Sequence, residues 1–180
     1  MSDHPARQHP NIVHGGDVPP MTNQQGDFEL AARRLGTAAK NIALGVALVE
    51  VPPGKTAFPN HYHSAIEEGI YILAGEATAR IGKDSIAVAA GDYIGYPPGP
   101  DHAHQLTNTG SEPLRYLALS APAVHLGMDI VGYPDSEKIA FMSGVKPGGI
   151  GWRDGAWVMK LIKSSAPDVG YFDDEPLAKK

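Results

Sequence analysis

Residues 58–76 read FPNHYHSAIEEGIYILAGE and place two histidines just ahead of two acidic residues and an apolar run. In an extended strand alternate side chains point to the same face, so His61 and His63 would present both imidazoles on one side. That spacing lets one strand supply two ligands to one metal ion. Taken alone the pair is weak evidence, because half-exposed histidine pairs also occur without a metal.

Two further features strengthen the interpretation. Glu67 and Glu68 stand at the start of the apolar run, where a carboxylate costs free energy unless a cation or a donor compensates it. A second pair, His102 and His104, has the same one-residue spacing ahead of another apolar run. A sheet that closes into a barrel brings such distant strands together, so both pairs could contribute to one site.

The fold class follows from short apolar runs separated by turns rich in glycine and proline. About eight strands at roughly 8–12-residue spacing predict an all-β protein, an antiparallel sandwich or barrel. Phe28, Leu30 and Ala32 alternate at the period of a strand, which favours an additional edge strand there. The other predicted strands cover residues 41–51, 69–73, 78–81, 86–90, 93–96, 103–107 and 114–120.

The 180 residues suffice for one domain with a sizeable core. Residues 1–26 lack periodicity and predict a loose N-terminal arm, either disordered or reaching to a partner subunit. Residues 27–125 are expected to form the barrel, and residues 126–180 a C-terminal extension packed on it. Trp152 and Trp157 are expected to cover an end of the barrel, because large aromatics in irregular segments usually pack.

Composition excludes several function classes. The chain has no cysteine, so disulfides, thiolate catalysis and iron–sulfur clusters are ruled out, and histidine and carboxylate remain as strong metal ligands. A net charge of -5 makes nucleic acid and anionic membrane surfaces unexpected partners. The N-terminus has no apolar signal segment, which predicts a cytoplasmic location.

The spacing of these histidines, acidic residues and glycines resembles that of the cupin superfamily. The first cupin motif is HxH, three or four residues, Glu, six residues and Gly, and Glu68 satisfies both spacings whereas Glu67 misses the second. The second motif is also present in order, and the resemblance covers about residues 42–120. The layout is similar to the single-domain bacterial group described as mannose-6-phosphate-isomerase-like. The matching residues are Gly54, His61, His63, Glu68 and Gly75, then Gly91, Pro97, Gly99, a histidine and Asn108. Gly54 lies one residue further from His61 than the usual pattern has it.

The resemblance implies a jelly-roll barrel and a metal site formed by His61, His63, Glu68 and one further histidine. In the second motif His102 fits the spacing from Gly99, whereas His104 fits the spacing to Asn108. This sequence therefore has two additional residues somewhere between Gly99 and Asn108. An insertion costs least in the turn at residues 100–101. We therefore expect His104 to be the fourth ligand and His102 to act as a catalytic base behind the ligands. Alternation along the two strands predicts that the pocket is lined by Ile70, Ile72, Leu106 and Asn108.

Three imidazoles and one carboxylate suit a single divalent ion (Zn, Mn, Fe, Ni or Co) that leaves positions open for a chelating ligand. The resemblance implies a metal-dependent enzyme of isomerase or lyase type acting on a small oxygenated metabolite, sugar-like or a hydroxy or keto acid. It equally admits an Fe(II)-dependent dioxygenase. A non-catalytic small-molecule binding module is the third interpretation, favoured by the lack of a lysine or arginine cluster near the motifs. An exposed edge strand predicts a homodimer.

Overall fold

The computed structural model describes residues 9–121, 128–143 and 158–167, and these are almost entirely strands and turns. Short 3-10 turns lie at Gly15–Asp17, Pro100–His102 and Pro134–Ser136, and α1 (Leu35–Ala38) is the one α-helix of the described residues. The strands are β1 (Met21–Gln25), β2 (Phe28–Arg33), β3 (Gly45–Val51), β4 (Tyr62–His63), β5 (Glu67–Ala74), β6 (Glu76–Ile81), β7 (Asp84–Ala89), β8 (Tyr93–Tyr96), β9 (His104–Asn108), β10 (Leu114–Ala121), β11 (Met128–Tyr133), β12 (Lys138–Ser143) and β13 (Val158–Lys163).

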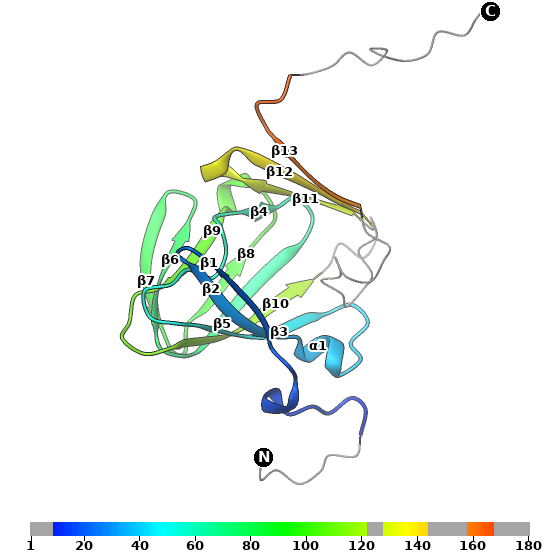
Figure 1. Ribbon diagram of the computed structural model, residues 1–180, viewed down its shortest axis with the longest axis vertical. Helices are drawn as coiled ribbons and strands as arrows, with labels where there is room; N and C mark the ends of the chain where they lie inside the picture. The colour runs from blue at the N-terminus through cyan, green and yellow to red at the C-terminus, as the bar shows by residue number, and fades with distance from the viewer. Residues whose placement is uncertain (1–8, 122–127, 144–157, 168–180) are drawn as a thin grey trace, which may run out of the picture.

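These strands form three sheets, and each ladder between them is antiparallel (Figure 1). A six-stranded sheet has the order β1-β2-β3-β10-β5-β8, a three-stranded sheet has the order β7-β6-β9, and a four-stranded sheet has the order β13-β12-β11-β4. The predicted all-β, antiparallel jelly-roll class is confirmed. The ladders do not close into one continuous barrel; single bridges such as Thr56 to Thr107 and His61 to His104 link them instead.

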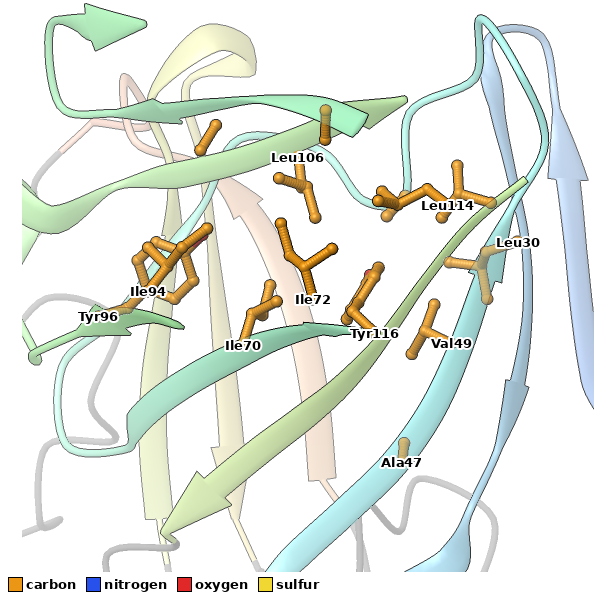
Figure 2. Packing of buried hydrophobic residues seen from close by; sticks show 14 residues of the cluster. Leu30, Ala47, Val49, Ile70, Ile72, Ile94, Tyr96, Leu106, Leu114 and Tyr116 are labelled. Carbon is orange, nitrogen blue, oxygen red and sulfur yellow. The ribbon is translucent and has the colours of Figure 1, made fainter. Parts of the chain in front are cut away.

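The core lies between the six-stranded and the three-stranded sheets, whose inward side chains meet in Figure 2. The alternation of side chains along each strand directs every second residue into this core. In β5, Ile70 and Ile72 are buried, whereas Tyr71 and Leu73 are exposed. Leu106 of β9 faces these isoleucines from the opposite sheet. This arrangement directs every second residue of β5, beginning with Glu68, toward the interior.

The N-terminal part of the chain differs from the expectation in two ways. Residues 28–33 form a strand as the alternation predicts, but β2 is not an edge, because β1 pairs along it from Met21 opposite Ala32 to Gln25 opposite Phe28. The expectation of a loose arm over residues 1–26 is therefore wrong for residues 21–25. The sequence of β1, MTNQQ, is mostly exposed and has no apolar alternation, so only its backbone pairing identifies it as a strand.

Strands β11, β12 and β13 form one sheet with β4, and the three lie at the top of Figure 1. β11 pairs with β4 through Val131 opposite His63, so the C-terminal region touches the segment that carries the first histidine pair. Trp152 and Trp157 lie outside the described residues, and the domain boundaries at residues 26 and 125 stay predictions. No helix of the described part of the chain is long and apolar enough to cross a membrane.

Candidate metal centre

Three predicted ligand histidines converge on one carboxylate oxygen of the fourth predicted site residue, Glu68. The Nε2 atoms of His104, His63 and His61 lie 3.2, 3.5 and 3.9 Å from Oε2 of Glu68. For His61, Glu68 and His104, one ligand atom each lies within 4.8 Å of the others, a grouping able to hold a metal ion. The structure thus brings together residues that are up to 43 positions apart in the sequence (104 − 61).

Backbone pairing sets the relative position of the two histidine motifs. The amide of His61 donates to the carbonyl of His104 at 3.1 Å, and the amide of His104 donates back to the carbonyl of His61 at 2.8 Å. β5 runs beside β8 and presents Glu68 opposite Tyr96. The ring of Tyr96 stacks on that of His104, with centroids 3.7 Å apart and planes 7° from parallel. Backbone pairing and ring packing therefore hold these candidate ligand side chains in place.

Each of the three imidazoles uses its Nδ1 atom for a hydrogen bond inside the protein. Nδ1 of His61 lies 2.8 Å from the Pro59 carbonyl, and Nδ1 of His104 lies 3.0 Å from the His102 carbonyl. A carbonyl oxygen only accepts, so both Nδ1 atoms carry the hydrogen and donate it. The Nε2 atoms are then left with their lone pairs directed at the Glu68 side, which is the tautomer that a metal ligand requires.

The third imidazole is held by a carboxylate that sequence reasoning missed. Nδ1 of His63 lies 2.5 Å from Oδ2 of Asp129, whose side chain is fully buried. The other oxygen of Asp129 accepts hydrogen bonds from the Ser64 amide, the Ser64 hydroxyl and the Ala65 amide. The sequence did offer one indication of this role: an acidic residue lies inside the apolar run of residues 128–133, and a buried carboxylate needs partners.

Burial and mutual charge set the ionisation of the cluster. Burial, reinforced by the neighbouring His104, lowers the pKa of His61 to about 4. Burial alone would raise the pKa of Glu68, but the contact with His104 and the other nearby imidazoles outweigh it and lower that pKa to about 2. Burial also disfavours charge on His63, yet the hydrogen bond with Asp129 prevails and raises its pKa. At neutral pH the cluster therefore holds a neutral His61 beside an ionised Glu68, a state suited to a cation.

Comparison with known families agrees with the fold. Residues 47–120 match the model of the cupin domain. This part of the chain is a cupin domain. A search of curated proteins finds no match to the chain.

Solved structures share the architecture of this cupin domain and its flanking strands. A protein of Acidithiobacillus ferrooxidans, provisionally assigned as a sugar phosphate isomerase, is 23% identical with a TM-score of 0.73, over 89% of this chain and 96% of its own. A sugar phosphate isomerase of the cupin superfamily from Silicibacter pomeroyi is 18% identical with a TM-score of 0.69, over 88% and 96%. A predicted oxalate decarboxylase of Thermotoga maritima is 25% identical with a TM-score of 0.54, over 62% and 98%.

Within the cupin domain the two candidate fourth ligands differ in position. His104 is the first residue of β9, whereas His102 ends the 3-10 turn that follows Gly99. The predicted insertion point, residues 100–101, lies in this turn. His102 contributes its carbonyl to the His104 ring, but its side chain does not line the cavity described below. The base role of its imidazole stays a prediction.

A cavity of about 420 Å³, lined by residues of the cupin domain and of the strands before it, contains the four-residue cluster on its wall. Ile70 and Leu106 line it as predicted. Ile72 does not, because it lies deeper in the core with no exposed surface. Asn108 does not either: its side-chain amide donates to the carbonyls of Val51 and Glu112, and its oxygen accepts from the Gly110 amide. Asn108 therefore stabilises a turn and leaves the pocket to apolar neighbours.

Proposed function

We propose that this protein is a metal-dependent enzyme of isomerase or lyase type that acts on a small oxygenated metabolite. The ion is held by His61, His63, Glu68 and His104, and the substrate, sugar-like or a hydroxy or keto acid, chelates it. One observation carries the proposal: three imidazoles fixed through Nδ1 direct Nε2 toward the same carboxylate oxygen.

The donor set fits a divalent transition ion. Three nitrogens and one oxygen suit Zn, Mn, Fe, Ni or Co, and the single carboxylate leaves one positive charge for a substrate oxygen to share. When bound, such an ion supplies Lewis acidity at that oxygen. Two structural neighbours are described as sugar phosphate isomerases, one of them provisionally, and their likeness to this chain is one of fold.

The surrounding side chains bind and orient the substrate and exclude water. Asp129 fixes the direction of the His63 ring, and Tyr96 supports the His104 ring by stacking. The hydroxyl of Tyr96 is buried and has no hydrogen-bond partner among the described residues. Burial and the charge of Glu68 raise the pKa of Tyr96, so the hydroxyl stays protonated and can donate to a substrate oxygen.

A non-catalytic binding module is the second candidate, and one observation favours it. Among the cavity-lining residues of the described chain, Arg34 is the one arginine or lysine, so few charged groups are available for acid–base or phosphate chemistry. If the native ion is Fe(II), the alternative enzyme is a dioxygenase rather than an isomerase or lyase.

The deciding experiment is a metal analysis followed by a substrate panel. Protein purified without chelating resin is analysed for bound ions and then incubated with sugar phosphates, 2-hydroxy acids and 2-keto acids under NMR observation. Turnover by the native protein but not by Glu68→Gln, which keeps the side-chain shape and loses the charge, supports the enzyme. Saturable, metal-dependent binding without turnover of any compound supports the binding module, and dioxygen consumption with bound iron supports the dioxygenase.

We also propose a homodimer. Tyr71 and Tyr93 lie opposite each other across β5 and β8, both are exposed, and β8 is the last strand of the six-stranded sheet. An exposed edge with aromatic side chains favours pairing with a second copy. A monomeric mass at micromolar concentration by light scattering would contradict this proposal.

A further inference from the structure

The cavity has a polar end and an apolar end, and strand register separates them. On the inner face of the six-stranded sheet, Glu68 lies opposite Ser120 on one side and Tyr96 on the other, and Ser120 lies opposite Gly45. We name Gly45, Ser120, Glu68 and Tyr96 the ligand row. All four line the cavity, and Ser120, Glu68 and Tyr96 place polar groups at the end next to the histidines.

Two residues away from the ligand row on each strand, the side chains are apolar, and two of the three are alanines. Ala118 lies opposite Ala47 on β3 and opposite Ile70 on β5, and these three, the alanine row, also line the cavity. Val49 and Tyr116 form the next row and close the chamber, since each is 1% exposed. Figure 2 shows Ala47 and Val49 on the same face of β3. The short side chains of Ala47 and Ala118 leave open the volume that larger residues would fill.

The remaining wall is mainly apolar, with Thr22, Asn23 and Gln105 as its uncharged polar side chains, and it provides little for an ionic ligand. Opposite the alanine row the lining includes Ala57 and Leu106, and Leu30 and Ala32 extend it toward β2. Arg34, at the start of α1, is the one basic residue other than histidine among the described lining residues, and it already has an interaction partner. A phosphate is bound by several charged or N–H donors together, and one buried against alkyl side chains would lose hydration without compensation.

The Tyr96 hydroxyl shows where the oxygenated part of a ligand belongs. Tyr96 is 2% exposed, lines the cavity and leaves its hydroxyl without a hydrogen-bond partner in the described chain. Buried hydroxyls are nearly always partnered, so an oxygen of the ligand at the ligand row would complete this one. The polar end of the ligand therefore lies beside Glu68, and whatever is attached to it extends over the alanine row.

We infer that the ligand of this site has an oxygenated, chelating head and an uncharged, mainly apolar body of several carbons, and that it is not a sugar phosphate. This inference rests on the proposed metal-dependent function for the head and on the cavity lining for the body. The volume of about 420 Å³ falls within the range of small-molecule pockets.

The test is a chain-length series measured by calorimetry on the Zn²⁺-loaded protein. The probes are 2-hydroxypropanoate, 2-hydroxyhexanoate and 2-hydroxyoctanoate, with fructose 6-phosphate as the sugar phosphate. We expect affinity to rise about fourfold for each added methylene, which corresponds to about 0.8 kcal/mol. We also expect fructose 6-phosphate to bind more weakly than 2-hydroxyoctanoate. Affinity that is independent of chain length, or tighter binding of fructose 6-phosphate, would overturn the inference.

A pair of variants locates the apolar body in the cavity. Ala118→Leu fills the alanine row and should weaken binding of 2-hydroxyoctanoate about tenfold or more, while 2-hydroxypropanoate changes less than about twofold. Ala87→Leu makes the same change at an exposed position of β7 and should alter neither. Equal weakening of both acids by Ala118→Leu would contradict the placement. If this variant does not fold, the chain-length series on the native protein still decides the inference.

The same series on metal-free protein separates the inference from the proposed function. If the metal-dependent function is wrong and the cavity is nonetheless apolar, octanoate and 2-hydroxyoctanoate will bind equally, with or without Zn²⁺, and the rise with chain length will persist. If the function is right and the inference wrong, Zn²⁺ will be required for binding and chain length will have no effect.

Discussion

Oδ2 of Asp129 lies 2.5 Å from Nδ1 of His63, although the two residues are 66 positions apart and only His63 belongs to the cupin domain. The strand that carries Asp129 pairs with the strand that carries His63, which fixes this contact. A carboxylate on the far nitrogen of a ligand histidine fixes the ring orientation and raises its basicity. Strand β11 thereby contributes a side chain to the candidate site.

Asp129→Asn should lower the affinity for Zn²⁺ by about 10- to 100-fold, because the amide cannot supply the charge that orients and polarises His63. A competition titration with a chromophoric chelator measures the change. Asp135→Asn is the matched control: Asp135 belongs to the same region but pairs with Arg80 at an exposed position. Unchanged affinity in Asp129→Asn, or an equal loss in both variants, would show that the contact with His63 has no role in the site.

The fourth ligand can be assigned by comparing His104→Ala with His102→Ala. His104 directs Nε2 at Glu68 from the start of β9, so its loss should abolish stoichiometric metal binding, as should His61→Ala or Glu68→Ala. It should also remove the rise in Tm that metal gives the native protein, because an ion that binds only the folded state stabilises it. His102→Ala removes a side chain that does not line the cavity and should retain the metal. Metal analysis of both variants decides: retention in His104→Ala with loss in His102→Ala would reverse the assignment.

Asn108→Ala should lower the free energy of unfolding by about 2–4 kcal/mol, since it leaves two carbonyls and one amide without their partner in a buried turn. Urea unfolding at pH 7 measures this. Thr109→Ala, next to it and exposed, should cost less than about 0.5 kcal/mol. Because Asn108 does not line the cavity, the variant should still bind Zn²⁺ in full; loss of the metal without loss of stability would assign it to the site after all.

The metal-free protein should lose stability in weak acid through His61. Its pKa is about 4 in the folded state, below the ordinary value of 6.5, so the unfolded chain binds the proton first as pH falls. The contribution of His61 is complete above pH 6.5 and is lost as pH falls toward 4, by about 2 kcal/mol between pH 7 and pH 5. The raised pKa of His63 acts in the opposite direction.

The measurement is the free energy of unfolding of chelator-treated protein at pH 7 and pH 5. His61→Gln should show a smaller decrease than the native protein, and His9→Gln, at an exposed position in the N-terminal region, should show the same decrease. If His61→Gln lost as much stability as the native protein over this range, the imidazole of His61 would not be the group responsible.

The sequence by itself determined the features that are encoded by spacing along one segment. Alternation identified β5 and the inward position of Glu68, and the HxH spacing predicted that His61 and His63 share a face. The cupin motifs selected Glu68 over Glu67, and the expected insertion at residues 100–101 falls in the observed turn at Pro100–His102. Such features depend on the alternation of side chains within one strand and on the turns beside it. Residues close together in the sequence specify both.

Only the tertiary structure decided which distant residues meet. Asp129 reaches His63 because β11 pairs with β4, and β1 is a strand because β2 offers it an unpaired edge, although neither pairing has a signature within its own segment. The cavity likewise exists because the register of β3, β10 and β5 aligns Ala47 with Ala118. An isolated alanine predicts no cavity; the volume arises when small side chains from separate strands fall in one row, and register between strands is fixed by the packing of the whole fold.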